Sequence, residues 1–336
     1  MKAIGYKESL PIENEKALQN IELETPKATG KDLLVQVKAI SVNPVDYKIR
    51  QNVAPENDTW KIIGWDAAGI VTAVGEETSL FKVGDEVYYA GDLTRSGSNA
   101  EFQLVDERIV GKKPTKLSFG DAAALPLTSL TAWELLFDRM QVEKDNPNKS
   151  ILVIGAAGGV GSIMTQLLKQ LTKLTIIGTA SREETTNWLK QLGTDHVINH
   201  RNKLSEEFST YNLAQPDYVV SLNATGQHKD EIVKIIKPQG KFGFIDDPKG
   251  GFDVMPFKTK AVSTHIEFMF TRSMFQTKDI TQQHNILNEV SKLIDAETIK
   301  TTVGNHFGKI NAENIRKAHV LLESGKSKGK IVLENF

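Results

Sequence analysis

Three regularly spaced glycines are the first residues of this chain whose types and spacing could do binding chemistry. Gly155, Gly158 and Gly161 are spaced G-x-x-G-x-x-G. Such glycines let the backbone approach a pyrophosphate, and the free N–H groups at the start of a following helix attract its charge. The turn, which also contains Gly159 and Val160, is compatible with a structural role, so its flanking elements decide between the two readings.

Those flanking elements favour a nucleotide site. Residues 151–154 are apolar and mostly β-branched, which is typical of a strand buried on both faces. Residues 162–174 predict a helix, because their leucine and isoleucine side chains recur on one face. A strand, a glycine turn and a helix in this order predict a dinucleotide-binding turn.

The end of the next predicted strand bears on the choice of cofactor. An NAD site usually has an acidic residue about 20 residues past the glycines, where it binds the ribose 2′-hydroxyl. Here Ser181 and Arg182 stand at that strand end, and Glu183 reads as the first residue of a helix. Arginine pairs well with a 2′-phosphate, so the sequence favours NADPH. A solvated arginine beside a helix-capping serine is the alternative.

A second polar segment joins a predicted strand to a predicted helix. Asn43 is a favoured N-cap residue, Pro44 suits the first helical position, and Asp46 falls in the first turn, where acidic residues are favoured. That pattern explains Asn43 and Asp46 as helix-start residues. The functional alternative is that this corner presents Asn43, Asp46, Tyr47 and Lys48 to a cleft.

Composition limits the classes of protein. The chain has 336 residues, 40% of them hydrophobic, which suits about two domains, and its net charge of −1 gives no sign of a nucleic-acid partner. It has no apolar run of membrane length and no secretory or transit pattern at its start, so we expect a cytoplasmic protein. The absence of cysteine excludes disulfides, thiol nucleophiles and cysteine-bound zinc.

The pattern of predicted elements changes near residue 120. Before it, short strands alternate with glycine and aspartate turns, which indicates a mainly β, partly open barrel. After it, helices and strands alternate, which indicates a doubly wound parallel sheet of the Rossmann type. The fold class is therefore α/β. We expect a catalytic domain from residues 1–125 and 273–336, and a dinucleotide-binding domain from residues 126–272.

Several segments together resemble the medium-chain dehydrogenase/reductase superfamily. Residues 64–75 resemble its G-x-[DE]-x-x-G-x-V-x-x-V-G signature, residues 84–87 its G-D-x-V turn, and residues 329–332 its usual ending. Residues 122–126 and 131–133 resemble its domain junction. The match is strongest to the quinone oxidoreductase-like branch. Within it, residues 41–46 and 97–102 resemble the bacterial subgroup called "zinc-type alcohol dehydrogenase-like", and a GroES-like barrel is implied for the first domain.

The chain departs from the alcohol dehydrogenases at the metal. Their first cysteine ligand would fall near Asn43, and their G-H-E motif falls at Gly64-Trp65-Asp66. Zinc needs three or four well-placed nitrogen, sulfur or oxygen ligands. The chain has no cysteine, and its histidines lack metal spacing; they are His196, His200, His228, His265, His284, His306 and His319. We therefore expect no metal ligands and no catalytic zinc.

The expected chemistry follows from the missing metal and from the resemblance. Without a Lewis acid, hydride acceptors that delocalise charge by conjugation are favoured, and the resemblance implies quinones or α,β-unsaturated carbonyls. It also implies that Asn43, Asp46, Tyr47 and Lys48 face the nicotinamide, with Lys48 donating to the substrate oxygen or holding the ribose. Further cofactor contacts are implied for Thr131, Asn223 and Lys330, the last of these reaching the phosphates.

Two other functions stay open at this point. One is an alcohol dehydrogenase with an atypical metal site. The other is an NADPH-binding sensor or structural protein without useful turnover, because a fold alone does not establish activity. The apolar run Ala261–Phe270 predicts a strand near a sheet edge, and by analogy with the fold it could pair with its twin in a homodimer.

Overall fold

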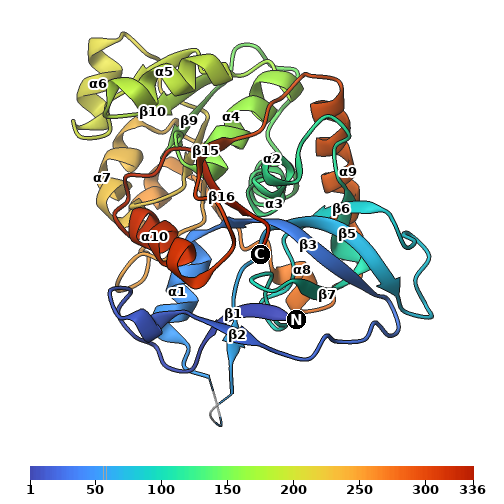
Figure 1. Cartoon of the computed structure of the whole chain (residues 1–336). Helices are drawn as coiled ribbons and strands as arrows, with labels where there is room; N and C mark the ends of the chain where they lie inside the picture. Colours follow the sequence, from blue (N-terminus) through green and yellow to red (C-terminus); the bar gives the residue numbers. More distant parts are fainter. Residues whose placement is uncertain (56, 58) are drawn as a thin grey trace. The chain divides into compact units, whose positions relative to one another are not determined.

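The computed structural model describes residues 1–55, 57 and 59–336 (Figure 1). The chain divides into two compact units, one made of residues 1–130 and 270–336, the other of residues 131–269. One unit is built on a parallel sheet and the other mainly on antiparallel strands, so the predicted fold class is confirmed. No helix within the described residues is both long enough and apolar enough to cross a membrane.

The unit of residues 131–269 contains a six-stranded sheet in the order β11-β10-β9-β12-β13-β14, and all its neighbouring strands are parallel. The order reverses between β9 and β12, which makes the carboxyl edge there the usual ligand position of such sheets. The strands are β9 Ser150–Ile154, β10 Thr175–Thr179, β11 His196–Ile198, β12 Tyr218–Ser221, β13 Lys241–Phe244 and β14 Ser263–Ile266. Its other elements are α4 Gly159–Leu171, α5 Glu183–Leu192, α6 Leu204–Thr210, α7 Thr225–Ile235, the π-helix Glu134–Arg139 and the 3₁₀ helix Met255–Lys260.

The central strands of this unit form its hydrophobic core. The four central strands are buried nearly throughout, as their continuous apolar sequences require. Phe242 stacks on Phe244 and Phe257 with ring centroids 5.5 and 5.3 Å apart, and these rings form part of the core. The rigid sheet therefore fixes the loops that follow its strands.

Several elements of this unit have bounds that differ from those the sequence predicts. The helix predicted over residues 162–174 runs from Gly159 to Leu171. The strand predicted over Ala261–Phe270 is limited to Ser263–Ile266. Helix α3 is followed by a π-helix that begins at Glu134, and residue spacing carries no signal for that wider turn. Helix α7 begins at Thr225, whose backbone N–H donates to the carboxylate of Asp246 at 3.0 Å, a contact with a distant residue that no local pattern reveals.

The other unit contains two sheets. The smaller has the order β2-β1-β4, with β1 Lys2–Tyr6, β2 Gln19–Glu22 and β4 Lys61–Ile62. The larger has the order β15-β16-β3-β5-β6-β8, and β7 also pairs with β3. Its strands are β3 Asp32–Val42, β5 Ala67–Val74, β6 Glu86–Tyr89, β7 Phe102–Asp106, β8 Val110–Lys112, β15 Val303–His306 and β16 Lys330–Glu334. The C-terminal strand β16 thus returns to the N-terminal part of the chain, as the sequence predicts.

Short helices complete this unit. They are α1 Pro44–Asn52, α2 Phe119–Ala123, α8 Thr271–Met274, α9 Gln282–Asp295, α10 Ala312–Glu323 and the 3₁₀ helices Glu15–Ala17 and Glu107–Ile109. Helix α3, Pro126–Trp133, spans the division between the units at residues 130 and 131. Helix α1 begins as predicted, with extended backbone at Asn43 followed by Pro44 in the first turn. The long central strand β3 carries the chain directly to that corner.

Candidate functional site

A buried polar cluster lies where three strands of the larger sheet meet. Strand β3 pairs with β16 through Val42 and Ile331, and with β5 through Ile40 and Ala67. These pairings bring together the residues next to the paired positions, which are Asn43, Asp66 and Lys330. The cluster is therefore positioned by a rigid antiparallel sheet rather than by a loop.

The amine of Lys330 lies at the centre of this cluster. It donates to Asp66 Oδ2 at 2.8 Å, to the main-chain oxygen of Val42 at 3.2 Å and to Asn43 Oδ1. The side chains of Lys330 and Asp66 are 3% and 0% exposed, so the ion pair is shielded from water. The predicted role of Lys330 at the cofactor phosphates stays a prediction; in the structure its amine has three acceptors within its own unit.

The remaining polar atoms of Asn43 and Asp66 are also bonded. The amide nitrogen of Asn43 donates to Asp66 Oδ2 at 2.9 Å and to the Ser41 main-chain oxygen at 3.3 Å. The other carboxylate oxygen of Asp66 accepts from the Leu127 backbone at 2.8 Å. Burial raises the pKa of Asp66, and the neighbouring Lys330 ammonium opposes that rise. Asn43 is thus fixed in one orientation.

Asp46 joins the cluster but keeps one oxygen unused. Its Oδ2 accepts from the Asn43 backbone N–H at 2.7 Å, which is the helix-start contact that its position predicts. Its Oδ1 is buried and has no hydrogen-bond partner. Burial raises the pKa of Asp46 to about 7, while the Asn43 N–H and Lys330 act in the opposite direction. A buried carboxyl with a spare oxygen and a pKa near neutrality can hold or donate a proton.

The four residues predicted to act in catalysis therefore fall into two groups. Asn43 and Asp46 belong to the cluster and are 1% and 2% exposed, whereas Tyr47 and Lys48 follow on α1 and are half-buried. Sequence reasoning considered Asp66 only as part of the altered G-H-E motif and missed it as a site residue. The available signal was a carboxylate between a tryptophan and the apolar start of a strand, a position that needs a buried partner.

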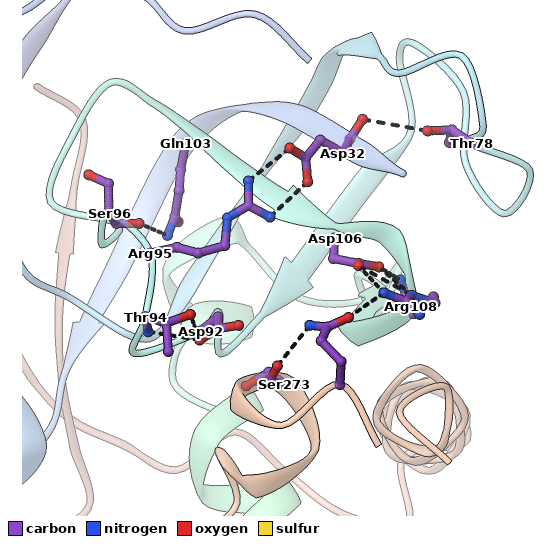
Figure 2. Close-up of polar contacts among 11 residues, drawn as sticks. Asp32, Thr78, Asp92, Thr94, Arg95, Ser96, Gln103, Asp106, Arg108 and Ser273 are labelled. Atoms are coloured by element: carbon purple, nitrogen blue, oxygen red, sulfur yellow. Dashed lines mark hydrogen bonds and ion pairs between the residues drawn. The ribbon is translucent and has the colours of Figure 1, made fainter. Parts of the chain in front are cut away.

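Hydrogen bonds connect the loop of residues 91–97 to other residues of its own unit (Figure 2). The guanidinium of Arg95 makes two hydrogen bonds to the carboxylate of Asp32, at 2.7 and 2.8 Å. The main-chain oxygen of Asp92 accepts from the Trp65 indole at 3.1 Å, one residue before Asp66. Gln103 also donates to the Ser96 main-chain oxygen at 3.0 Å, as Figure 2 shows. Because Arg95 is engaged in this way, we assign it a role in holding the loop.

The glycine turn in the other unit has the conformation that its sequence predicts. Gly155 has a φ of +78°, and a Cβ there would lie 2.5 Å from Oδ1 of Asn223. A Cβ on Gly161 would lie 2.3 Å from the Ala156 main-chain oxygen, so the helix packs closely on the turn. At Gly158 a Cβ would meet nothing nearer than 3.5 Å. The backbone at Gly158, the N-cap of α4 just before Gly159 and Val160, therefore has open space beside it.

The predicted cofactor residues of this unit follow neighbouring strands. Ser181 and Arg182 follow β10, where Arg182 is the N-cap of α5, and Asn223 follows β12. Since the strands are parallel, their carboxyl ends share one edge with the glycine turn after β9. Thr131 is buried in α3, at the start of this unit. Arg182 is exposed and Ser181 is half-buried at this edge.

Two family descriptions match the chain. Residues 29–132 match the family described as "Alcohol dehydrogenase GroES-like domain". Residues 192–333 match the family described as "Zinc-binding dehydrogenase". Together they cover parts of both units.

Individual relatives match over nearly the full length. A "Zinc-type alcohol dehydrogenase-like protein" of Staphylococcus epidermidis is 37% identical over 99% of both chains. The "2-methylene-furan-3-one reductase" of Solanum lycopersicum is 30% identical, covering 99% of this chain and 79% of its own. Among solved structures, a putative zinc-dependent alcohol dehydrogenase protein from Rhizobium etli is 53% identical, with a TM-score of 0.96 and coverage of 100% and 98%. The quinone oxidoreductase from Coxiella burnetii is 26% identical, with a TM-score of 0.82 and coverage of 99% of each chain.

Proposed function

The chain belongs to the medium-chain dehydrogenase/reductase superfamily, and from this premise we propose that it is an NADPH-dependent reductase of quinones or α,β-unsaturated carbonyls that works without zinc. Membership of the superfamily and the likeness to its "zinc-type" subgroup confirm the resemblance seen in the sequence. An oxidoreductase is what this family implies. The cofactor, the acceptor and the independence from zinc are the proposal.

One observation carries the proposal: Lys330 binds the oxygens of Asn43 and Asp66. By resemblance, Asn43 falls near the first cysteine ligand of the alcohol dehydrogenases, and Trp65-Asp66 fall at the histidine and glutamate of their G-H-E motif. The donors there are an amide, a carboxylate and a main-chain oxygen, all engaged by an ammonium, and the chain has no cysteine. This donor set does not fit zinc, which prefers three or four nitrogen or sulfur ligands with an occasional carboxylate.

The acceptor class follows from the lack of a fitting metal site. A simple carbonyl needs strong polarisation to accept hydride, whereas a conjugated acceptor spreads the new charge over several atoms. Two of the proteins described above carry names for such acceptors, one a methylene-furanone reductase and the other a quinone oxidoreductase. These names support, for this chain, a conjugated carbonyl or quinone as substrate.

The residues of the chain would divide the remaining work. A bound NADPH supplies the hydride. The open turn at Gly158 would receive the pyrophosphate, and Arg182 would pair with the 2′-phosphate beside Ser181. Thr131 and Asn223 would hold the nicotinamide half. Tyr47 or Lys48 would donate a hydrogen bond to the reduced oxygen, and Asp46, through its unused Oδ1, would hold the proton that completes the reduction.

The experiment that tests the function is NADPH consumption with a small quinone and with a simple enone, in the presence of a chelator. NADH is run in parallel at the same concentration. Turnover that survives the chelator and prefers NADPH is the expected result. Tight NADPH binding without turnover of either acceptor would favour the non-catalytic sensor instead.

A further inference from the structure

We propose that the ammonium of Lys330 is the built-in cation of the oxygen cage formed by Asn43, Asp66 and the Val42 carbonyl, and that shortening this side chain turns the cage into a binding site for a small primary ammonium ion. This inference rests on the proposed function only where it says that the cage holds no zinc. It adds what occupies the cage and which class of ligand can replace it.

The geometry of the cage suits a primary ammonium. An ammonium group has three N–H donors and no acceptor, and Lys330 Nζ has three oxygen partners. One partner is ionisable, one is a side-chain amide and one is a main-chain carbonyl. Each donor is therefore used, and the only formal negative charge among the three partners lies 2.8 Å from the positive one.

The same geometry disfavours a divalent metal. A metal ion would have to share the oxygens of Asn43 and Asp66 with a positive group that already lies among them. All the oxygens of the cage are hard donors, whereas zinc prefers nitrogen and sulfur ligands, and the chain has no cysteine to supply a thiolate. Within the described residues, no group of three or more His, Cys, Asp or Glu side chains is placed to hold a metal ion.

The charges around the cage explain why it needs a cation. Asp66 is fully buried, and its negative charge contributes to the raised pKa of the neighbouring buried Asp46. Removing the Lys330 amine would leave these groups with no buried positive partner in the cage. A buried uncompensated carboxylate is strongly unfavourable, so the emptied volume should select a cation small enough to enter and able to donate hydrogen bonds.

Chemical rescue of Lys330→Ala tests the inference. The melting temperature of the variant is measured with n-propylammonium chloride and with tetramethylammonium chloride at equal concentration, because only the first can donate three N–H bonds. We expect propylammonium to raise the melting temperature of the variant by about 5 °C above tetramethylammonium, on the scale of a restored buried pair. The unmodified protein should have the same melting temperature in the two salts.

Lys113→Ala is the matched control. Lys113 is also buried and donates to the carbonyls of Pro114 and Leu117, at 2.9 and 2.7 Å, but its carboxylate partner Glu86 is half exposed. Because water can solvate Glu86 after the truncation, propylammonium should have no specific effect on this variant. An equal rescue of both variants, or no rescue of Lys330→Ala, would overturn the inference.

A second measurement does not depend on the variant folding. The unmodified protein is incubated with excess zinc, passed through a desalting column and analysed for metal by mass spectrometry. Less than about 0.1 zinc per chain is expected, since Lys330 holds the cage oxygens that zinc would need. Retention of one zinc per chain that is lost in Asp66→Asn would overturn the inference. The rescue measurement uses neither zinc, NADPH nor a quinone, so its failure is distinct from a failure of the proposed function. Retained zinc would count against both, whereas a lack of quinone turnover would count against the proposed function alone.

Discussion

The amine of Lys330 lies 2.8 Å from Oδ2 of Asp66, although 264 residues separate them along the chain. The pair joins the last strand of the chain to the start of β5, and both side chains are shielded from water. Asn43 completes the contact from the end of β3. The arrangement makes a helix-start corner and a C-terminal strand parts of one site.

Removing the negative charge of Asp66 from this ion pair should destabilise the protein. Asp66→Asn would leave the Lys330 ammonium buried without a charged partner, so we expect a loss of about 3–5 kcal/mol in the free energy of unfolding. Urea titration measures it. Asp145→Asn is the control, because Asp145 is 89% exposed in its ion pair with Lys173 and should change stability by less than about 0.5 kcal/mol. Equal losses of stability in the two variants would mean that the buried ion pair stabilises the protein no more than the exposed one.

Asp46→Asn should separate catalysis from folding. Asparagine can still accept the hydrogen bond from the Asn43 backbone, but it cannot supply a proton from the unused oxygen. We expect kcat for the enone to fall roughly 100-fold, within the range of general acid catalysis, while the melting temperature does not fall. Unchanged kcat at neutral pH would remove Asp46 from the proton step.

Arg182→Ala should change cofactor preference. Its guanidinium follows β10, at the edge where the 2′-phosphate is proposed to lie. Losing a charge-assisted pair predicts a rise of about 10–100-fold in the KM for NADPH, with KM for NADH nearly unchanged. Lys190→Ala, in the last turn of the same helix, is the control for charge alone. An equal loss for both cofactors would contradict the assignment.

Two glycines of the turn should respond differently to alanine. At Gly161 a Cβ would lie 2.3 Å from main-chain oxygen, so Gly161→Ala should lower the melting temperature. At Gly158 a Cβ would meet nothing nearer than 3.5 Å, so Gly158→Ala should fold normally. Its methyl group would instead obstruct the proposed pyrophosphate position and weaken NADPH binding. Differential scanning calorimetry gives the melting temperature of each variant, and titration calorimetry gives its affinity for NADPH. Unimpaired NADPH binding by Gly158→Ala would contradict this position for the pyrophosphate.

His319 should make stability depend on pH. Burial, with Arg50 nearby, lowers the pKa of His319 to about 3, from about 6.5 in an unfolded chain. Below pH 6.5 the unfolded state therefore binds a proton that the folded state does not, and stability falls as the pH falls. Relative to His319→Asn, the unmodified protein should lose about 2 kcal/mol more between pH 7 and pH 5. His196→Asn is the control, because His196 is exposed. If the free energy of unfolding of His319→Asn and of the unmodified protein changed with pH in parallel, the prediction would be refuted.

Local patterns predicted much of the parallel-sheet unit. The turn Gly155–Gly161 and its flanking elements are contiguous in sequence, and the next helix begins at Glu183, as the sequence predicts. These elements are set by periodicity and by glycine punctuation. Elements whose structure is set by neighbouring residues could therefore be predicted from the sequence.

The centre of the candidate site could not be predicted in this way. The partners of Lys330 come from two other strands, and only the sheet pairing brings them together. The family resemblance implies a phosphate contact for Lys330 and places Asp66 in an altered G-H-E motif, and neither points to the contact between the two. The proposed NADPH site, the homodimer and the cytoplasmic location remain predictions.

The most direct test of the account is the rate of NADPH oxidation by a small quinone, measured per chain and plotted against the concentration of added zinc. Samples range from protein stripped with chelator to protein assayed in excess zinc, with bound metal quantified by mass spectrometry. The account predicts substantial turnover in the stripped enzyme and a rate that does not change with zinc. A rate that rises in proportion to zinc and vanishes in its absence would contradict the metal-free reductase.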